Sequence, residues 1–179
     1  MNKFERVSKF ADNENIQLPI RATKYSAGYD FYAADTITVP SYKRAMETLS
    51  DYVAIKIPYG VDEFKQISKA VKIKPTLVPT GIKCKLDDGY YLELAIRSSV
   101  PLNNWIVLAN GVGVIDKDYY DNPDNEGEIF FQVINLSPVD QIIRFGEKIG
   151  QGIIKRYYTV EDDAADGERL GGFGSTTNE

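Results

Sequence analysis

The segment from Asn110 to Tyr119 places an aspartate and a tyrosine after a glycine-containing turn, an arrangement that can support chemistry. Its glycines favour a tight hairpin, and the apolar run that follows them leads to Asp116. A carboxylate at this position can act as a general base, can bind a metal ion or can only form a turn. The segment by itself does not decide among these alternatives.

Three other segments carry groups that can bind phosphate oxygens. Arg97-Ser98-Ser99 offers a guanidinium and two hydroxyls, and Gly146–Gln151 ends in an amide after a basic turn. Arg169–Thr176 combines a cation, hydroxyls and glycines, whose backbone can approach a phosphate closely. Phe173 stands between glycines there, which predicts a flap that becomes ordered when the ring stacks on a planar ligand. The first two segments, taken singly, are also common in ordinary loops.

The composition excludes several classes of function. The sequence has no histidine, which removes the Ser-His-Asp and Cys-His catalytic arrangements and the commonest nitrogen ligand of zinc. Acid–base chemistry therefore falls to carboxylates, lysines or tyrosines. A net charge of −5 argues against direct nucleic acid binding, since a duplex-binding surface needs clustered Lys and Arg.

The length of 179 residues, with 43% hydrophobic residues, predicts a single domain with small attachments. The apolar runs are of strand length and are interrupted by charges, and the first residues contain no apolar segment of signal-peptide length. We therefore expect a cytoplasmic protein without membrane association. Cys84 is the only cysteine, so it cannot form an internal disulfide, and it is predicted to pack within a strand.

Apolar and polar residues alternate with a period of two over much of the chain, and turns such as Asp88-Gly89 and Phe145-Gly146 separate the runs. Many short strands with frequent turns indicate an all-β fold, either a jelly roll or a β-barrel. The predicted strands are residues 37–40, 52–57, 77–84, 90–96, 106–109, 112–115, 129–136 and 149–158.

Two segments depart from this alternation. Residues 61–71 carry apolar side chains at helical spacing and predict one short helix, which either closes one end of the barrel or binds a partner. This helix belongs to an insert at about residues 41–75. Residues 168–179 contain three glycines and small polar residues, so we expect a mobile C-terminal arm beyond a single β domain at residues 1–167.

The segments that can do chemistry occur in the order of the five sequence motifs of the trimeric dUTPases, and the chain resembles that family. The spacing agrees, because Arg97 lies thirteen positions before Asn110 and nineteen before Asp116. The insert at 41–75 and an extra loop at 120–126 resemble the longer dUTPases of phages and Gram-positive bacteria. The segments similar to the motifs are Ala27–Ala33, Arg97–Ser99, Asn110–Tyr119, Gly146–Gln151 and Arg169–Thr176.

The resemblance implies an all-β, distorted jelly-roll enzyme that hydrolyses dUTP to dUMP and pyrophosphate as a homotrimer with shared active sites. By this resemblance, Asp116 would activate the attacking water, Tyr119 would pack against deoxyribose and Phe173 would cover the base. The uracil edge would be read by Asn110, Gly113, Val114 and Ile115. Further substrate contacts, chiefly to phosphates, would come from Arg97, Ser98, Ser99, Gln151, Arg169, Gly174, Ser175 and Thr176.

The same resemblance implies Mg²⁺ as the cofactor, held by the phosphates of the substrate. A metal ion bound there would offset charge that an acidic protein does not neutralise. Asp30 is expected to act on the metal ion, or on its surroundings, through water.

Two alternative functions stay open. A dCTP deaminase shares the fold and the Arg-Ser-Ser triplet, but its chemistry needs a proton-carrying glutamate where this sequence has Gln132. A regulatory module that binds a host or phage protein through residues 41–75 is the other alternative. The intact Asp116, Tyr119 and Gln151 favour catalysis without excluding this second role.

Overall fold

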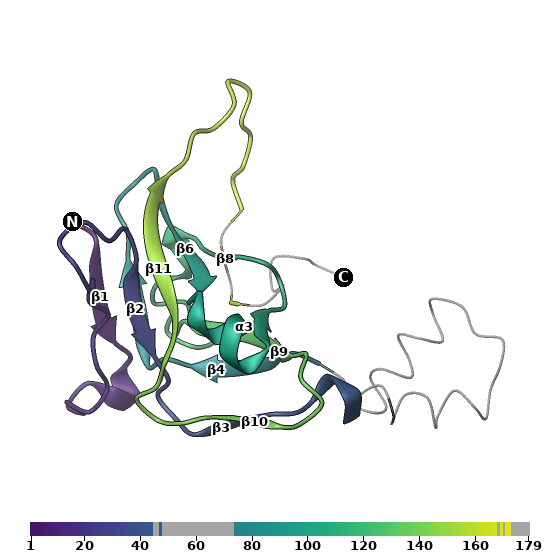
Figure 1. The fold of residues 1–179 in the computed structure, drawn as a ribbon. Helices are drawn as coiled ribbons and strands as arrows, with labels where there is room; N and C mark the ends of the chain where they lie inside the picture. The colour runs from purple at the N-terminus through teal and green to yellow at the C-terminus, as the bar shows by residue number, and fades with distance from the viewer. Residues whose placement is uncertain (45–46, 48–73, 168, 170, 173–179) are drawn as a thin grey trace, which may run out of the picture.

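The computed structural model describes residues 1–44, 47, 74–167, 169 and 171–172 (Figure 1). Short antiparallel strands dominate these residues. The strands are β1 (Lys3–Arg6), β2 (Tyr29–Tyr32), β3 (Ile37–Val39), β4 (Thr76–Pro79), β5 (Ile82–Lys85), β6 (Tyr90–Ile96), β7 (Ile106–Leu108), β8 (Gly113–Ile115), β9 (Phe130–Asn135), β10 (Gln141–Ile143) and β11 (Lys148–Arg156). The short helical elements include η1 (Ser8–Phe10), α3 (Ser99–Asn104) and η2 (Lys117–Tyr119).

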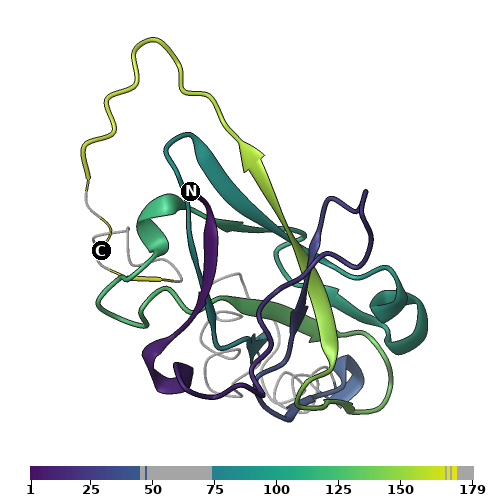
Figure 2. The ribbon, with the colours of Figure 1, turned by 90° about the vertical axis from the view of Figure 1, so that its left-hand side faces the viewer.

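Within the described chain the strands form four small sheets, in the orders β2-β11-β6-β8, β4-β9-β7, β1-β5 and β3-β10. Figures 1 and 2 show β2, β11 and β6 side by side, and in Figure 1 strands β4 and β9 run across their direction. This arrangement confirms the predicted all-β, jelly-roll-like fold. No described helix is long and apolar enough to cross a lipid bilayer.

Most of the predicted strands are present where alternation placed them. The strand predicted at 90–96 is β6, with the same limits. Five others differ from the observed strands by at most two residues at either end, namely those predicted at 37–40, 106–109, 112–115, 129–136 and 149–158. The strand at 52–57 and the helix at 61–71 lie outside the described residues.

The continuous strand predicted at 77–84 is wrong, because the chain forms β4 and β5 with a turn between them. The hydroxyl of Thr80 causes the break: it donates to the Ile129 carbonyl at 2.7 Å and accepts from the Ile82 N–H at 3.2 Å. The sequence patterns do not predict β1, β2, β10 or α3, which are three to six residues long and show no clear periodicity.

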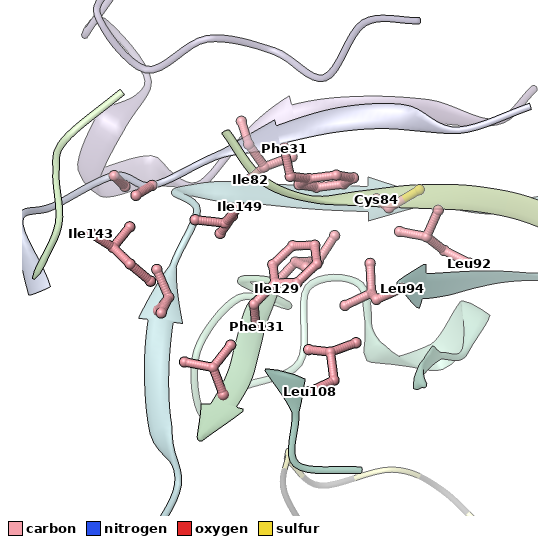
Figure 3. Packing of buried hydrophobic residues seen from close by; sticks show 14 of the residues in the cluster. Phe31, Ile82, Cys84, Leu92, Leu94, Leu108, Ile129, Phe131, Ile143 and Ile149 are labelled. Atoms are coloured by element: carbon pink, nitrogen blue, oxygen red, sulfur yellow. The ribbon is translucent and has the colours of Figure 1, made fainter. Parts of the chain in front are cut away.

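The core lies beneath the pairing of β6 with β11. Leu92 and Leu94 of β6 are fully buried, and Gly150 and Gly152 of β11 face the same interior. The rings of Phe31 and Phe131 pack against these glycines from the core side. The centroids of the two rings lie 5.7 Å apart (Figure 3). Two bulky aromatic rings can therefore pack directly onto the backbone of β11.

Cys84 lies in this core, as predicted. Its side chain is buried and unpaired, and burial raises the pKa of the thiol to about 12. The thiol therefore stays protonated and packs as a small apolar group.

The close contact between Gly150 and Phe131 predicts a large effect of a single methyl group. A Cβ atom at position 150 would lie 2.6 Å from Phe131 Cζ, closer than real atoms approach. We expect Gly150→Ala to lower the free energy of unfolding by about 2–3 kcal/mol, measured by urea denaturation. Gly167→Ala is the matched control, because a Cβ there meets nothing within 4 Å. Equal stability of the two variants would contradict this account of the core.

Candidate active site

The hairpin between β7 and β8 carries the first group of candidate residues. Gly111 adopts φ +73°, a left-handed conformation that favours glycine, and the Val112 N–H donates to the Asn110 carbonyl at 2.8 Å. Strand β8 then pairs with β6, with Gly113 opposite Leu94 and Ile115 opposite Leu92. The turn and the pairing together fix the point at which Asp116 leaves the sheet.

A pocket of about 240 Å³ lies beside this hairpin. Its walls are largely apolar, with a few side-chain amides and charged groups. The residues that line it are Leu94, Asn110, Gly113, Val114, Ile115, Asp116, Tyr119, Phe130, Gln132 and Arg169. The structure thus brings together the residues predicted for uracil, for deoxyribose and for water activation, together with one arginine of the arm. Their roles remain predictions.

Asp116 is half exposed and lies against a guanidinium from the arm. Arg169 donates from Nη2 to Asp116 Oδ2 at 2.6 Å and from Nε to Asp118 Oδ1 at 2.7 Å. Burial raises the pKa of the Asp116 carboxyl, and the neighbouring Arg169 acts in the opposite direction. The carboxylate is therefore a stronger base than an exposed aspartate, and the arginine limits how far its basicity rises.

Tyr119 forms one wall of the pocket, and its side chain is buried. Its hydroxyl donates to the Glu128 carbonyl at 2.9 Å and accepts from Asn125 Nδ2 at 2.8 Å. Burial raises the pKa of this phenol, so the ring presents a neutral, rigid surface to the pocket. Gly172 of the arm lies against the ring, since a Cβ atom there would be 3.0 Å from Tyr119 Cε2.

A second group of candidate residues lies on the outer face of the four-stranded sheet. Asp30 of β2 pairs in register with Gln151 of β11, and both point away from the core. Asp30 Oδ2 accepts from Lys148 Nζ at 2.8 Å, and its Oδ1 lies 3.6 Å from Arg97 Nε. The buried carboxylate thus holds two cations on this face, while the sequence patterns had assigned Lys148 no role.

Gln151 depends on Gly28 of the neighbouring segment. A Cβ atom on Gly28 would lie 3.0 Å from Gln151 Cβ and still closer to Oε1, so glycine leaves the space that this side chain fills. The motif around Asp30 contains Gly28, but the motif alone does not predict this contact. Only the pairing of β2 with β11 brings the two residues together.

The remaining candidates are placed as follows. Ser98 and Ser99 are exposed, and they form the N-cap and the first residue of α3. The arm residues Phe173, Gly174, Ser175 and Thr176 lie outside the described residues. The roles predicted for these side chains are therefore not tested by the structure.

The two groups of candidates lie far apart in one chain. Asp116 follows Ile115, which pairs with Leu92 of β6, whereas Arg97 comes directly after β6, five residues beyond Leu92. At about 3.3 Å per residue, the two positions are separated by about 15–20 Å along the strand. The backbone positions of Asp116 and Arg97 therefore lie near opposite ends of β6.

The described residues offer no closed set of protein ligands for a metal ion, since no three of their Asp, Glu, Cys or His side chains lie close enough together to hold one. Asp30 is already paired with Lys148 and Arg97, which reduces its capacity to bind a cation. Any divalent ion at this site would therefore need ligands from outside the described residues.

Comparison with known proteins places the chain in a family. A model of the dUTPase family matches residues 66–177, more than half of the chain. The deoxyuridine 5'-triphosphate nucleotidohydrolase of Lactococcus lactis subsp. lactis (strain IL1403) is 37% identical over 175 residues, which cover 97% of this chain and 95% of that protein. The protein of the same name from Helicobacter pylori (strain P12) is 28% identical over 169 residues, 90% of each chain. The chain belongs to the dUTPase family.

Solved structures agree with this assignment and with the predicted similarity to phage and Gram-positive members. The crystal structure of the Streptococcus mutans dUTPase superposes with a TM-score of 0.67 at 32% identity, covering 88% of this chain and 98% of that one. A dUTPase from phage phi11 of S. aureus, described with a structural Mg(II) ion, gives a TM-score of 0.59 at 19% identity over 93% of this chain and 97% of its own. The latter likeness supports the fold alone.

The contact between Arg169 and Asp116 predicts how the Asp116 carboxyl titrates. Because the guanidinium stabilises the charged form, Arg169→Ala is expected to raise the pKa of Asp116 further. Arg169→Lys keeps a positive charge and should raise it less. The measurement is a ¹³C NMR titration of the side-chain carboxyl, with Asp116→Asn used to assign its signal. An unchanged or lower midpoint in Arg169→Ala would show that the ion pair does not influence this carboxyl.

Proposed function

We propose that this protein hydrolyses dUTP to dUMP and pyrophosphate. The observation that carries the proposal is the single pocket in which the hairpin, Asn110 and Tyr119 meet Asp116. Its volume of about 240 Å³ lies below the roughly 300–1,000 Å³ of typical ligand pockets, so it suits one pyrimidine ring and its sugar. The triphosphate must then extend out of the pocket, past Asp116.

Asp116 is the group available to activate water. It would accept a proton while the water oxygen forms a bond to the α-phosphorus. The bond from this phosphorus to the oxygen that bridges to the β-phosphate breaks, and pyrophosphate leaves with the electron pair. A positioned base of this kind accounts for about 10²–10⁴ of the rate enhancement.

Selectivity for the nucleoside follows from the rigid parts of the pocket. Hairpin backbone groups fixed by the pairing of β8 with β6 would read the uracil edge and reject the amino group of cytosine. Tyr119 would leave no room for a 2′-hydroxyl. Gln132 lines the same pocket, and its amide cannot carry the proton that deamination requires. The geometry therefore favours dUTP hydrolysis over a dCTP deaminase activity.

Phosphate binding is assigned to the outer-face group, with Asp30 as its anchor. Arg97 and Lys148 would present positive charge to phosphate oxygens, and Gln151 would present an amide. We infer that this group and the hairpin of another copy meet in a homotrimer, because their separation in one chain leaves each incomplete. Phe173, Gly174, Ser175 and Thr176 would close over the ligand from the arm.

The substrate would enter with Mg²⁺ on its phosphates, and the ion, when bound, neutralises phosphate charge. Arg97 and Gln151 would hold the phosphate oxygens that bear the ion, and Asp30 would act near it through water. We expect the reaction to take place in the cytoplasm. Binding of a regulatory protein through the insert at 41–75 stays a prediction, since residues 45–46 and 48–73 lie outside the described chain.

Asp116→Asn tests the proposed reaction. The amide keeps the shape of the side chain but cannot accept the proton, so pyrophosphate release from dUTP should fall by at least about 10²-fold. Binding of dUTP, measured by calorimetry, should remain within a few fold of the parent protein. If Asp116→Asn released pyrophosphate at close to the parental rate, Asp116 would not be the catalytic base. If the parental protein released no pyrophosphate from dUTP, the proposed function would be wrong.

Mixing two inactive variants tests the shared site. Asp116→Asn lacks the base of the hairpin, and Arg97→Ala lacks a cation of the outer face, so neither alone should turn over dUTP efficiently. If the two groups come from different copies, mixed trimers refolded at equal ratio should recover activity in about one quarter of their sites. Each variant refolded alone is the control. No recovery in mixtures shown to be trimeric would place both groups of a site in one chain.

A further inference from the structure

The extra loop between Tyr119 and β9 is a hydrogen-bonded block rather than a loose connection. The buried Asn122 organises it, because its Nδ2 donates to the Tyr119 carbonyl and to Asn125 Oδ1, both at 2.8 Å. Its Oδ1 accepts from the backbone N–H groups of Asp124 at 3.1 Å and Asn125 at 3.2 Å. All polar atoms of the Asn122 side chain are thus used inside the block.

Asn125 connects this block to the ring of Tyr119. Its Oδ1 accepts from the Gly127 N–H at 3.0 Å and from Asn122 Nδ2, so the amide nitrogen must point the other way. That nitrogen donates to the Tyr119 hydroxyl at 2.8 Å, while the hydroxyl donates to the Glu128 carbonyl at 2.9 Å. The far end of the ring is therefore fixed by two hydrogen bonds, one from Asn125 within the loop and one to Glu128 just after it.

The block is itself attached to η1 and to β5. The Glu126 carboxylate accepts from the Ser8 N–H at 2.9 Å and from the Ser8 hydroxyl. Asp121 forms an ion pair with Lys83 of β5. These contacts hold the loop against the β1-β5 sheet, so the position of Asn125 does not depend on the hairpin alone.

We propose that Asn125 is a positioning residue for sugar selection, acting through Tyr119; this rests on the proposed function. Exclusion of a 2′-hydroxyl requires a rigid wall, since a shift of the ring by about 1 Å would make room for an additional oxygen atom. Buried packing fixes the base of the ring, and the hydrogen bond from Asn125 limits the swing of its free end. The inserted loop thereby contributes to the choice between deoxyribonucleotide and ribonucleotide without touching either one.

The test compares kcat/KM for dUTP and for UTP in the full-length protein. Loss of one buried hydrogen bond changes an equilibrium by about 5–10-fold, and we expect Asn125→Ala to lower the dUTP/UTP ratio by that factor, chiefly through faster UTP turnover. Asn125→Asp keeps the oxygen that accepts from Gly127 but loses the donor, so it should lower the ratio as well. Asp124→Ala is the matched control, because only its backbone N–H takes part in the described loop bonds, and its ratio should equal the parental one.

A double-mutant cycle with Tyr119→Phe separates positioning from general loop stability. Removing the hydroxyl deletes the atom through which Asn125 acts, so Asn125→Ala should lower the ratio no further in the Tyr119→Phe background. The inference would be overturned if the two substitutions lowered the dUTP/UTP ratio additively. A folded Asn125→Ala variant with the parental dUTP/UTP ratio would also overturn it. Loss of folding in both Asn125 variants would also overturn it, since the residue would then be structural. Failure of the parent protein to hydrolyse dUTP would count instead against the proposed function.

Discussion

The pairing of β11 with β6 is the constraint on which the rest of the structure depends. Seven consecutive residues of β11, from Gly150 to Arg156, face β6 in antiparallel register. On the inner face, Gly150 and Gly152 leave room for the rings of Phe131 and Phe31, which complete the core. On the outer face, the same register places Gln151 beside Asp30. One strand pair therefore builds the core and presents the polar group at the same time.

The same register also separates the two halves of the chemistry. The hairpin joins the sheet at the end of β6 near Leu92, whereas Arg97 leaves it at the other end. A strand is too stiff to bring these ends together, so the separation is built into the fold. An active site that needs both a base and phosphate-binding cations is then most simply completed between copies, which gives the proposed trimer a physical reason.

Within the hairpin pocket, opposing interactions set the pKa of Asp116, and two hydrogen bonds hold the ring of Tyr119. Burial raises the pKa of Asp116, and Arg169 counteracts that effect. An arginine held by a carboxylate is also available to phosphates, and its transfer to a triphosphate would leave Asp116 a stronger base. Tyr119 is held in a comparable way, between the Glu128 carbonyl and the Asn125 amide. The pocket is thus shaped by contacts that originate outside the hairpin.

The sequence by itself determined the elements that depend on neighbours a few residues apart. Alternation predicted β6 with its limits, and the five ordered motifs predicted the fold and family. Only the tertiary structure decided which distant residues meet, such as Gln151 with Gly28 and Arg169 with Asp116. The reason is that side-chain periodicity reports the local backbone conformation, whereas contacts between remote segments depend on strand register and packing throughout the sheet. The hydrogen bond from Asn125 to Tyr119 joins residues only six positions apart, but it lies in an irregular loop, which has no side-chain periodicity to predict it.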